Sequence, residues 1–247
     1  MIERCIQKAA TFPLLPKVYK CSMCGNNVSF MLPTGTKSKI FNELNIVGGG
    51  YRKSVTCPVC GATDRIRWID YVIGHTTGIY KEKCSVLHIA PESCIAEKIR
   101  RNKGAEYITG DICADDVDVR VDLTKMQFSD KKFDYIIANH VLEHIEDVDS
   151  ALNEVKRCLK DTGKFLFSFP VCPICKTIEM QGNLTDEERL KYYGQTDHCR
   201  LYGSDAAESV EKIGFSVREY NVSNMIKPEE IRRKRYLLQD RVYIATK

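Results

Sequence analysis

Four of the twelve cysteines form two short pairs that can hold a metal ion. The pairs are Cys21-x-x-Cys24 and Cys57-x-x-Cys60, and a glycine follows each of them directly. Two intervening residues let both thiolates of a pair reach one ion, and the glycine permits the positive φ at which the chain turns back. Together the pairs supply the four sulfur ligands of a closed structural zinc site. We therefore expect these cysteines to bind Zn²⁺, which would contribute most of the folding free energy of so small a ribbon.

The function of this ribbon has two interpretations. Residues 1–60 carry eight Lys or Arg and two acidic residues, a net charge of +6, whereas the whole chain carries +4. A basic ribbon can contact an anionic substrate such as nucleic acid. It can equally serve as a structural clip or docking surface for the next domain. The excess charge is modest and no basic–aromatic platform accompanies it, so nucleic acid is not the favoured partner.

A second group of residues has the types needed for acid–base chemistry. His140, Glu143 and His144 stand at i, i+3 and i+4, a spacing that places them on one face of a helix. Because imidazole titrates near neutrality, His140 or His144 is a candidate general base. The alternative is that these side chains cap a helix and face solvent.

These residues need elements to position them, and from residue 84 onward β-rich runs alternate with helical patterns. Such alternation is typical of an α/β fold with a parallel sheet. A helix is expected before it, at 65–73. The expected strands are 85–90, 106–110, 117–123, 133–138, 164–169, 215–222 and 241–246. The expected helices are 93–103 with Ser93 as cap, 148–159, 204 or 205–213, and 228–238, and a turn is expected at 161–163.

Ligands of open α/β sheets bind beyond the carboxyl ends of the strands. Residues 90–92, Asp111, 122–123 and 139–140 follow strands and are therefore the candidate binding positions. Asp111 comes 19 residues after Glu92, a spacing typical of an acid that hydrogen-bonds a ribose. No Gly-x-Gly-x-x-Gly follows the first strand and no Gly-x-x-x-x-Gly-Lys-Ser/Thr occurs, which disfavours dinucleotide and nucleoside-triphosphate sites. The expected ligand contains a nucleoside without a polyphosphate.

The composition is ordinary for a soluble globular protein. Apolar residues make up 43% of the 247 residues and charged residues 28%. No apolar run approaches the ~18 residues of a membrane span, and the first residues contain no apolar signal segment. We therefore expect a cytoplasmic protein without membrane contact, whose thiols stay reduced and whose cysteines serve metal binding or catalysis before disulfides.

The segments 133–145 (FDYIIANHVLEHI) and 159–164 (LKDTGK) resemble the Rossmann-like, class I, type 11-like methyltransferases that use S-adenosylmethionine. The resemblance covers roughly residues 84–247. It implies a seven-stranded sheet with the last strand antiparallel and helices on both faces, preceded here by a zinc-ribbon module. We expect the ribbon over 1–62, a linking helix within 63–83, and the methyltransferase domain over 84–247 with a lid insertion at 170–203.

The resemblance also implies the cofactor contacts. Asp111 would bind the ribose hydroxyls, Asp122 and the Leu123 backbone the adenine edge, and Asn139 would lie near the methionine moiety. Most members have Asp-x-Gly-x-Gly after the first strand, whereas this chain has His88-Ile89-Ala90-Pro91-Glu92. His88, Ala90, Pro91 and Glu92 are therefore the candidate contacts of that loop.

The segment 194–203 (GQTDHCRLYG) resembles a subgroup of these enzymes that modifies precursors of bacterial surface polysaccharides. The resemblance implies O-methylation of a small, sugar-like acceptor, either phosphorylated or unphosphorylated. The expected acceptor-binding residues are Tyr192, Tyr193, His198, Arg200 and Tyr202. His140, Glu143 and His144 also resemble the Glu-x-x-Glu-His of metal-dependent O-methyltransferases, which raises a second divalent ion as an alternative to the histidine base.

Other interpretations remain open at this point. The acceptor could be ribosomal or transfer RNA held by the ribbon, or the chain could be a non-enzymatic adaptor on a degenerate fold. Cys172 and Cys175 could form a second zinc site with His198 and Cys199. The sequence does not establish the oligomeric state.

Overall fold

The computed structural model of the chain describes residues 2–247. Its N-terminal part consists of short elements around a small cluster of buried residues that includes Cys21, Val28 and Cys57. Two of them, β1 and β2, pair antiparallel, and so do β3 and β4. The elements are α1 (Ile2–Thr11), β1 (Tyr19–Lys20), β2 (Asn27–Val28), β3 (Leu32–Thr34), α2 (Lys39–Glu43) and β4 (Arg52–Thr56).

The rest of the chain alternates strands and helices, as the sequence pattern predicts. Its first half contains α3 (Asp64–Thr76), β5 (Cys84–Ile89), α4 (Ser93–Arg100), β6 (Ala105–Asp111), β7 (Val119–Arg120), β8 (Phe133–Asn139) and the 3-10 turn η1 (Leu142–His144). Its second half contains α5 (Val148–Cys158), β9 (Leu159–Ser168), α6 (Asp186–Tyr193), α7 (Ala206–Lys212), β10 (Ser216–Asn221), α8 (Val222–Met225), α9 (Pro228–Lys234) and β11 (Arg241–Thr246).

Seven strands form one sheet in the order β10-β11-β9-β8-β5-β6-β7. The pairs from β9 to β7 are parallel, whereas β11 runs antiparallel to both β9 and β10. The Rossmann-like α/β class with an antiparallel last strand is therefore confirmed. All the parallel strands end at the same edge of the sheet.

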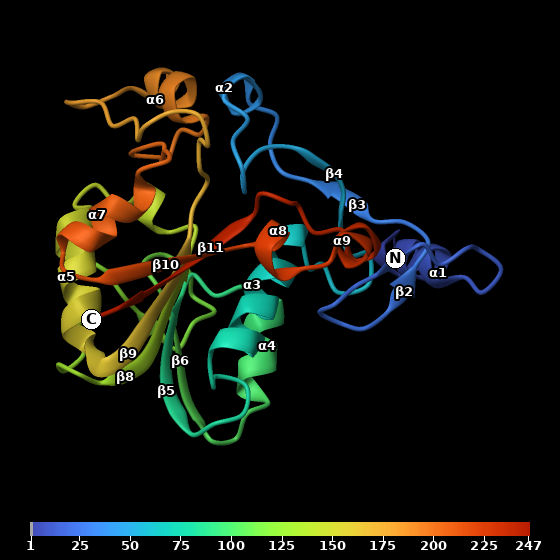
Figure 1. Ribbon diagram of the computed structural model, residues 1–247, viewed down its shortest axis with the longest axis horizontal. Helices are drawn as coiled ribbons and strands as arrows, with labels where there is room; N and C mark the ends of the chain where they lie inside the picture. Colours follow the sequence, from blue (N-terminus) through green and yellow to red (C-terminus); the bar gives the residue numbers. More distant parts are fainter. Residues whose placement is uncertain (1) are drawn as a thin grey trace.

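Helices cover both faces of this sheet (Figure 1). On one face, α5 and α7 pack against a core that includes Leu87, Phe133 and Phe165. On the other face, α3, α4, α8 and α9 pack against a second core that includes Trp68, Val86 and Leu166. The helix predicted at 65–73 is thus α3, which covers the sheet directly. The N-terminal ribbon continues from it on the same side (Figure 1).

Several local predictions were wrong. The third strand contains only Val119 and Arg120, because Asp118 turns back to accept hydrogen bonds from the Thr109 amide and hydroxyl. The cap of α4 is Glu92 and not Ser93. Residues 161–163 form an irregularity within β9 instead of a turn before it. Helix α9 ends at Lys234 because Arg235 adopts a left-handed conformation (φ 54°).

Two further corrections concern residues with candidate chemistry. The helical face predicted for 140–144 does not form, because His140 has φ 54° and only the single turn η1 follows it. Cys172 and Cys175 form a disulfide, so they are not ligands of a second zinc site. Among residues 2–247, no helix is long and apolar enough to cross a lipid bilayer.

Candidate active site and zinc centre

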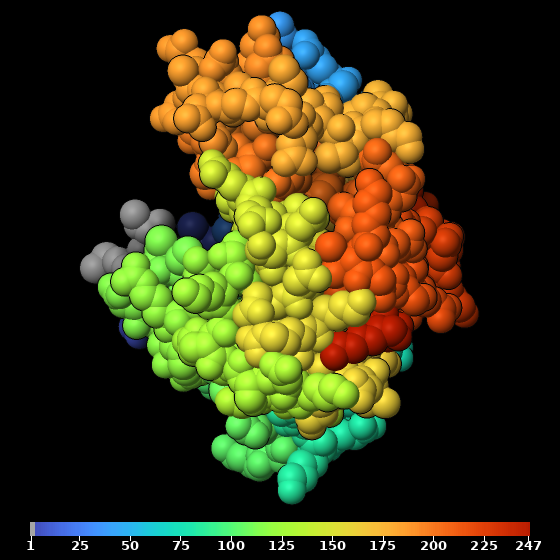
Figure 2. Space-filling model, turned by 90° about the vertical axis from the view of Figure 1, so that its left-hand side faces the viewer, coloured from blue at the N-terminus to red at the C-terminus, as the bar shows by residue number. Residues whose placement is uncertain are grey.

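A cavity of about 690 Å³ lies at the carboxyl ends of β5, β6, β7 and β8. Figure 2 shows the hollow on this side, between the lid insertion in orange and the segment after β6 in green. The cavity brings together the strand ends selected from the sequence. Its lining includes Ala90, Asp111, Asp122, Leu123, His140, His144 and, from the lid, Asp197.

Two carboxylates in this cavity are held in fixed orientations by their own backbone. Asp111 Oδ1 accepts hydrogen bonds from the amides of Cys113 and Ala114, at 2.7 and 2.9 Å. Asp122 Oδ1 accepts from the amide and hydroxyl of Thr124, at 2.8 and 2.7 Å. Within residues 2–247, Oδ2 of each carboxylate has no partner, so each offers one acceptor to a ligand such as a ribose or an adenine amino group.

The loop after β5 reverses direction without the glycines of related enzymes. Ala90 takes over the left-handed conformation with φ 47°, and its amide donates to the Gly110 carbonyl. His88 is fully buried, with Nε2 2.9 Å from Glu92 Oε2 and Nδ1 2.9 Å from the Tyr107 hydroxyl. Of the residues expected at this loop, Ala90 lines the cavity, whereas His88 and Glu92 brace the loop from behind and Pro91 is not part of the lining.

Asn139 is the last residue of β8 and is not itself part of the cavity lining, which at this strand end begins with His140. It is buried, and its Oδ1 accepts a hydrogen bond from the Ser168 hydroxyl at 3.2 Å. No described residue accepts a hydrogen bond from its Nδ2. A buried amide with an unused donor is a candidate contact for a ligand.

His140 contacts Arg65, a residue that the sequence analysis did not select. Arg65, from the start of α3, is half-buried and places its NH1 3.2 Å from His140 Nδ1 and 3.0 Å from the Gly48 carbonyl. Burial and then the Arg65 charge hold the pKa of His140 well below its ordinary value, so the ring is neutral. The sequence indicated only that residues 47–51 form a glycine-rich loop. No local pattern connects Arg65 with a histidine 75 residues later.

Glu143 stands in an environment that suits a cation. Its side chain is 2% exposed, and neither carboxylate oxygen has a hydrogen bond to any described residue. Oε1 lies 3.1 Å from His140 Nδ1. Burial raises the pKa of Glu143 to about 8. An unpaired buried carboxylate is unfavourable unless it is neutralised by a proton or a positive charge.

Two imidazoles complete a possible ligand set around Glu143. Ligand atoms of Glu143, His144 and His198 all lie within 4.8 Å of one another. The rings of His144 and His198 meet edge to face, at 4.7 Å between centroids. Burial lowers the pKa of His198 to about 4, so this ring is neutral and can ligate. His144 Nδ1 lies 3.1 Å from the Asp197 carbonyl and 3.2 Å from its carboxylate, which orients the ring and leaves Nε2 free.

The lid insertion clamps the turn that carries these ligands. Arg200 is buried and donates to the carbonyls of Leu142 and Glu146 at 2.9 Å each, and also to that of Ile145. The Cys199 amide donates to the Glu143 carbonyl at 2.8 Å. Arg200 thus fixes the turn η1 through its backbone.

The tyrosines expected to bind the acceptor lie elsewhere in the lid. Tyr202 is buried and stacks on Phe169 at 4.0 Å, and its hydroxyl has no partner among the described residues. Tyr193 is buried, and its hydroxyl accepts from the Met180 amide. Tyr192 is half-buried beside α2. Of the five residues expected to bind the acceptor, only His198 joins the group around Glu143.

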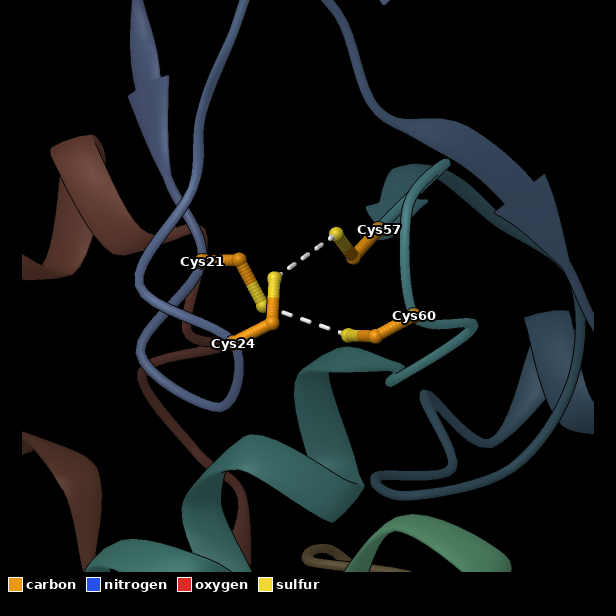
Figure 3. Close-up of side chains that lie close together, drawn as sticks. All are labelled: Cys21, Cys24, Cys57 and Cys60. Atoms are coloured by element: carbon orange, nitrogen blue, oxygen red, sulfur yellow. Dashed lines mark hydrogen bonds between the residues drawn. The ribbon is translucent and has the colours of Figure 1, made fainter. Parts of the chain in front are cut away.

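The four ribbon cysteines converge on one point (Figure 3). Cys21 Sγ lies 3.7 Å from Cys60 Sγ, and Cys24 Sγ lies 3.8 Å from Cys57 Sγ. Four thiolates at about 2.3 Å from a tetrahedral zinc ion are about 3.8 Å apart, so the donor set fits Zn²⁺. The two pairs are built alike, because the glycine amide after each pair donates to the first cysteine's carbonyl, with φ 76° at Gly25 and 73° at Gly61.

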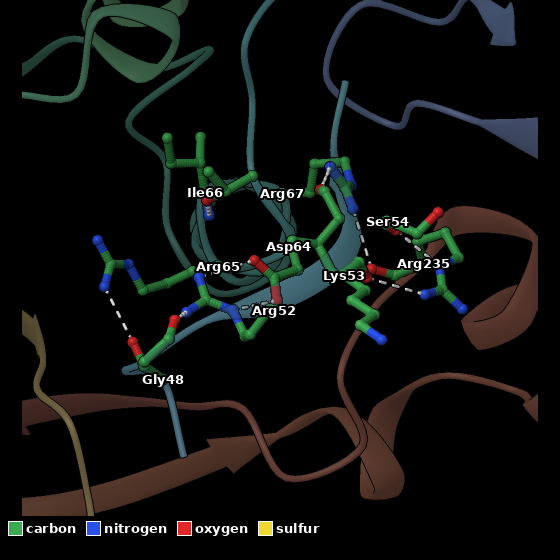
Figure 4. A network of polar contacts seen from close by, with 12 residues as sticks. Gly48, Arg52, Lys53, Ser54, Asp64, Arg65, Ile66, Arg67 and Arg235 are labelled. Carbon is green, nitrogen blue, oxygen red and sulfur yellow. Dashed lines mark hydrogen bonds and ion pairs between the residues drawn. The ribbon is translucent and has the colours of Figure 1, made fainter. Parts of the chain in front are cut away.

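A network of arginines joins this ribbon to the rest of the fold (Figure 4). Arg52 of β4 makes two hydrogen bonds to the buried Asp64 carboxylate, at 2.8 and 3.1 Å. Arg67 is fully buried and donates to the Val55 and Ala62 carbonyls as well as to two carbonyls at the end of α9. Arg235 donates back to the Ser54 carbonyl. The ribbon is therefore fixed against α3 and α9.

Comparison with known proteins finds a family match in the central part of the chain. Residues 75–167 match the model of a family described as "Methyltransferase domain". A SAM-dependent methyltransferase from Archaeoglobus fulgidus is 18% identical with a TM-score of 0.48, over 74% of this chain and 94% of that chain. A chain of the complex between the Haloferax volcanii Trm112 methyltransferase activator and a methyltransferase is 14% identical with a TM-score of 0.48, over 72% and 89% of the two chains. No curated protein sequence matches the chain.

Proposed function

We propose that this chain is an S-adenosylmethionine-dependent methyltransferase that O-methylates a small, sugar-like acceptor, since residues 75–167 match the model of a methyltransferase domain. The cofactor would occupy the cavity over β5 to β8, with Asp111 on the ribose and Asp122 and Leu123 at the adenine. Asn139 would lie near the methionine moiety. The two aspartates line this cavity and each uses only Oδ1 in hydrogen bonds to neighbouring residues, which supports this placement.

One observation carries the choice of a hydroxyl acceptor: the buried Glu143 carboxylate, which has no hydrogen bond to a described residue, lies beside His144 and His198. These three residues would hold a divalent cation at the wall of the cofactor cavity, which His144 lines. When bound, such an ion coordinates and acidifies a hydroxyl group, which a sulfonium methyl donor does not do by itself. A nitrogen acceptor needs no such acidification when it is already a free amine.

The remaining residues would align the reactants and exclude water. The sulfonium is already activated, so catalysis depends on in-line placement of the acceptor oxygen. Arg65 NH1 and Glu143 Oε1 lie 3.2 and 3.1 Å from His140 Nδ1 and would hold the ring in place. His140 would therefore orient the site instead of serving as the base, and Glu143 and His144 would serve as ligands.

Binding of Mn²⁺ alone tests the metal site, because Mn²⁺ does not favour the thiolate ribbon. Electron paramagnetic resonance of the zinc-loaded protein should show one bound Mn²⁺. Glu143→Gln keeps the side-chain volume and should weaken binding at least about ten-fold. Asp149→Asn, an exposed acid in the first turn of α5, is the matched control and should bind normally. Equal Mn²⁺ affinity in Glu143→Gln would rule the site out.

The acceptor class is tested with methyl-labelled S-adenosylmethionine. The protein is incubated with the small-molecule fraction and, separately, with the RNA fraction of a bacterial extract. We expect label in polar small molecules that resists mild alkali, as a methyl ether does and a methyl ester does not. Label confined to RNA would instead favour the basic ribbon as an RNA-binding surface, and its transfer would then be salt-sensitive.

A further inference from the structure

The chain after α1 forms a loop, residues 11–18, whose apolar side chains face solvent. All eight residues of this apolar loop are exposed. Ten large apolar side chains are exposed among the described residues, and four of the ten lie in this loop. They are Phe12 (50% exposed), Leu14 (85%), Leu15 (43%) and Val18 (56%). Apolar side chains exposed singly need no explanation, but a cluster of them marks a surface that contacts a partner.

The apolar loop has a defined shape, because hydrogen bonds close it. The Leu15 amide donates to the Phe12 carbonyl at 3.1 Å, which makes a turn at the start of the loop. The Lys17 ammonium group donates to the carbonyls of Ala10 and Phe12 and so ties the end of the loop to α1. Two prolines restrict the backbone further. The apolar side chains are therefore presented on a preformed backbone, which lowers the entropic cost of binding.

The apolar loop lies at the end of the molecule farthest from the sheet (Figure 1). The preceding helix α1 packs on the zinc ribbon through the buried Ala10 and through Gln7, whose side-chain amide donates to the Val59 carbonyl at 3.2 Å. The hollow of the cofactor cavity is seen from the opposite side of the molecule in Figure 2. A large partner bound at the loop would therefore leave the cofactor cavity open.

The sequence around the apolar loop is exclusively basic in its charges. Residues 4–42 contain six Lys or Arg and no acidic residue. Arg4 and Lys8 are exposed on α1, directly before the loop, and Lys17 is exposed within it. Apolar side chains flanked by cations are typical of segments that lie in the interface of an anionic lipid bilayer. A stable protein interface takes about 20–30 residues from each partner, many more than this loop provides.

We propose that the apolar loop docks the chain on the surface of an anionic lipid bilayer. Its four apolar side chains enter the boundary between headgroups and acyl chains, and the neighbouring cations contact the lipid phosphates. The expectation of no membrane contact was based on the absence of a spanning or signal segment, and an interfacial loop is neither. The inference does not rest on the proposed function, since the loop shares no residue with the cofactor cavity.

Sedimentation with lipid vesicles tests the proposal on the zinc-loaded protein. The protein should bind vesicles of phosphatidylcholine mixed with phosphatidylglycerol, more weakly those of phosphatidylcholine alone, and less as salt screens the charges. Leu14→Ser should weaken binding about ten-fold, because one apolar side chain no longer leaves water for lipid. Leu190→Ser, at a 51% exposed position of α6, is the matched control and should bind normally. Both variants should keep the unfolding temperature of the unaltered protein, since both leucines are exposed.

The contributions of charge and of insertion are measured separately. Lys8→Gln should weaken binding to the mixed vesicles about five-fold through loss of one cation near the lipid surface. Lys212→Gln, which removes an exposed cation from α7, should not. Leu14→Trp places an indole in the apolar loop, and its fluorescence should shift to shorter wavelength when the mixed vesicles are added.

Three results would overturn the proposal. The first is that the unaltered protein binds neither kind of vesicle, and the second is that Leu14→Ser binds as tightly as the unaltered protein. The third is an unchanged emission wavelength of Leu14→Trp on vesicles that carry the protein, which would show that the loop stays in water. If sedimentation equilibrium shows a dimer that Leu14→Ser abolishes, the loop contacts a second copy of the chain, and the lipid assignment is wrong.

Discussion

Two individual residues adopt a strained backbone conformation where the chain reverses direction after β5 and β8. Ala90 and His140, each at the carboxyl end of a strand in the cofactor cavity, have φ of 47° and 54°. This conformation costs an L-residue roughly 1–2 kcal/mol. Strain of this kind persists where the surroundings hold the residue, and it is concentrated at functional sites.

Ala90→Gly should therefore raise the free energy of unfolding by about 0.5–1 kcal/mol, because glycine adopts the left-handed conformation without strain. Ala207→Gly in α7 is the control and should lower it by about 1 kcal/mol through helix propensity. Urea unfolding of both variants gives the comparison. A loss of stability in Ala90→Gly equal to that in Ala207→Gly would show that position 90 is not strained.

We expect the stability of the fold to depend on pH through Asp240, which is not one of the proposed metal ligands. It is buried, its Oδ2 has no partner among described residues, and burial raises its pKa to about 7 from the ordinary 3.8. Between these values the folded state holds a proton that the unfolded state has released. Stability therefore falls as pH rises through this window, by up to about 1.4 kcal/mol per pH unit.

Asp240→Asn should remove this decrease in stability with rising pH. Measured by urea unfolding from pH 5.5 to 8, with zinc present, the variant should gain stability relative to the unaltered protein as pH rises. A constant difference between the two proteins across the range would contradict the assignment, since a purely structural effect of the substitution does not depend on pH.

At the scale of elements, the lid matters because it fixes η1. Arg200 donates to three carbonyls in and around this turn, and so holds the backbone that carries Glu143 and His144. Arg200→Lys cannot reproduce the planar, multiply bonded contact. It should weaken Mn²⁺ binding about ten-fold or more, as loss of a residue that orients ligands does.

Arg200→Lys should keep its affinity for S-adenosylhomocysteine, since Arg200 is not among the residues that line the cofactor cavity. Calorimetry with the thioether serves as the folding control. Unchanged Mn²⁺ affinity in a folded Arg200→Lys would show that the clamp does not position the ligands. Arg189→Lys, another lid arginine that donates to the His198 carbonyl, provides a second variant if Arg200→Lys fails to fold.

Periodicity predicted the elements of the sheet but not the turn that carries the chemistry. Apolar runs located the central strands within a few residues, since β5, β8 and the second half of β9 are largely buried. The i, i+3, i+4 spacing of His140, Glu143 and His144 predicted a helical face that does not form. Instead, the turn is shaped by hydrogen bonds from Arg200 and Cys199, more than fifty residues later, which no local pattern encodes.

At the scale of the whole molecule, the cysteine spacing predicted the zinc centre but not where it would place the intervening loop. The residues between the two pairs reach the wall of the active site, where Val47 forms an isolated antiparallel bridge with Val171. Gly48 lies beside His140 through this arrangement. Such contacts depend on how the ribbon docks, and the buried arginines that dock it resemble ordinary surface charges in the sequence.

Metal analysis should find one tightly bound zinc ion per chain, and Cys57→Ser should remove it. Loss of the ion should lower the unfolding temperature, because the metal stabilises the ribbon. Affinity for S-adenosylhomocysteine should change little, since the residues lining the cofactor cavity all lie between 89 and 197. Normal zinc content in Cys57→Ser would contradict the four-cysteine site.

The central claim is that the cavity over β5 to β8 binds S-adenosylmethionine, and calorimetric titration with S-adenosylhomocysteine tests it most directly. One molecule should bind per chain. Asp111→Asn should weaken binding about ten-fold through loss of a charged hydrogen bond to the ribose, whereas Asp149→Asn should not. Absence of binding to the unaltered protein, or equal affinity in Asp111→Asn, would contradict the claim.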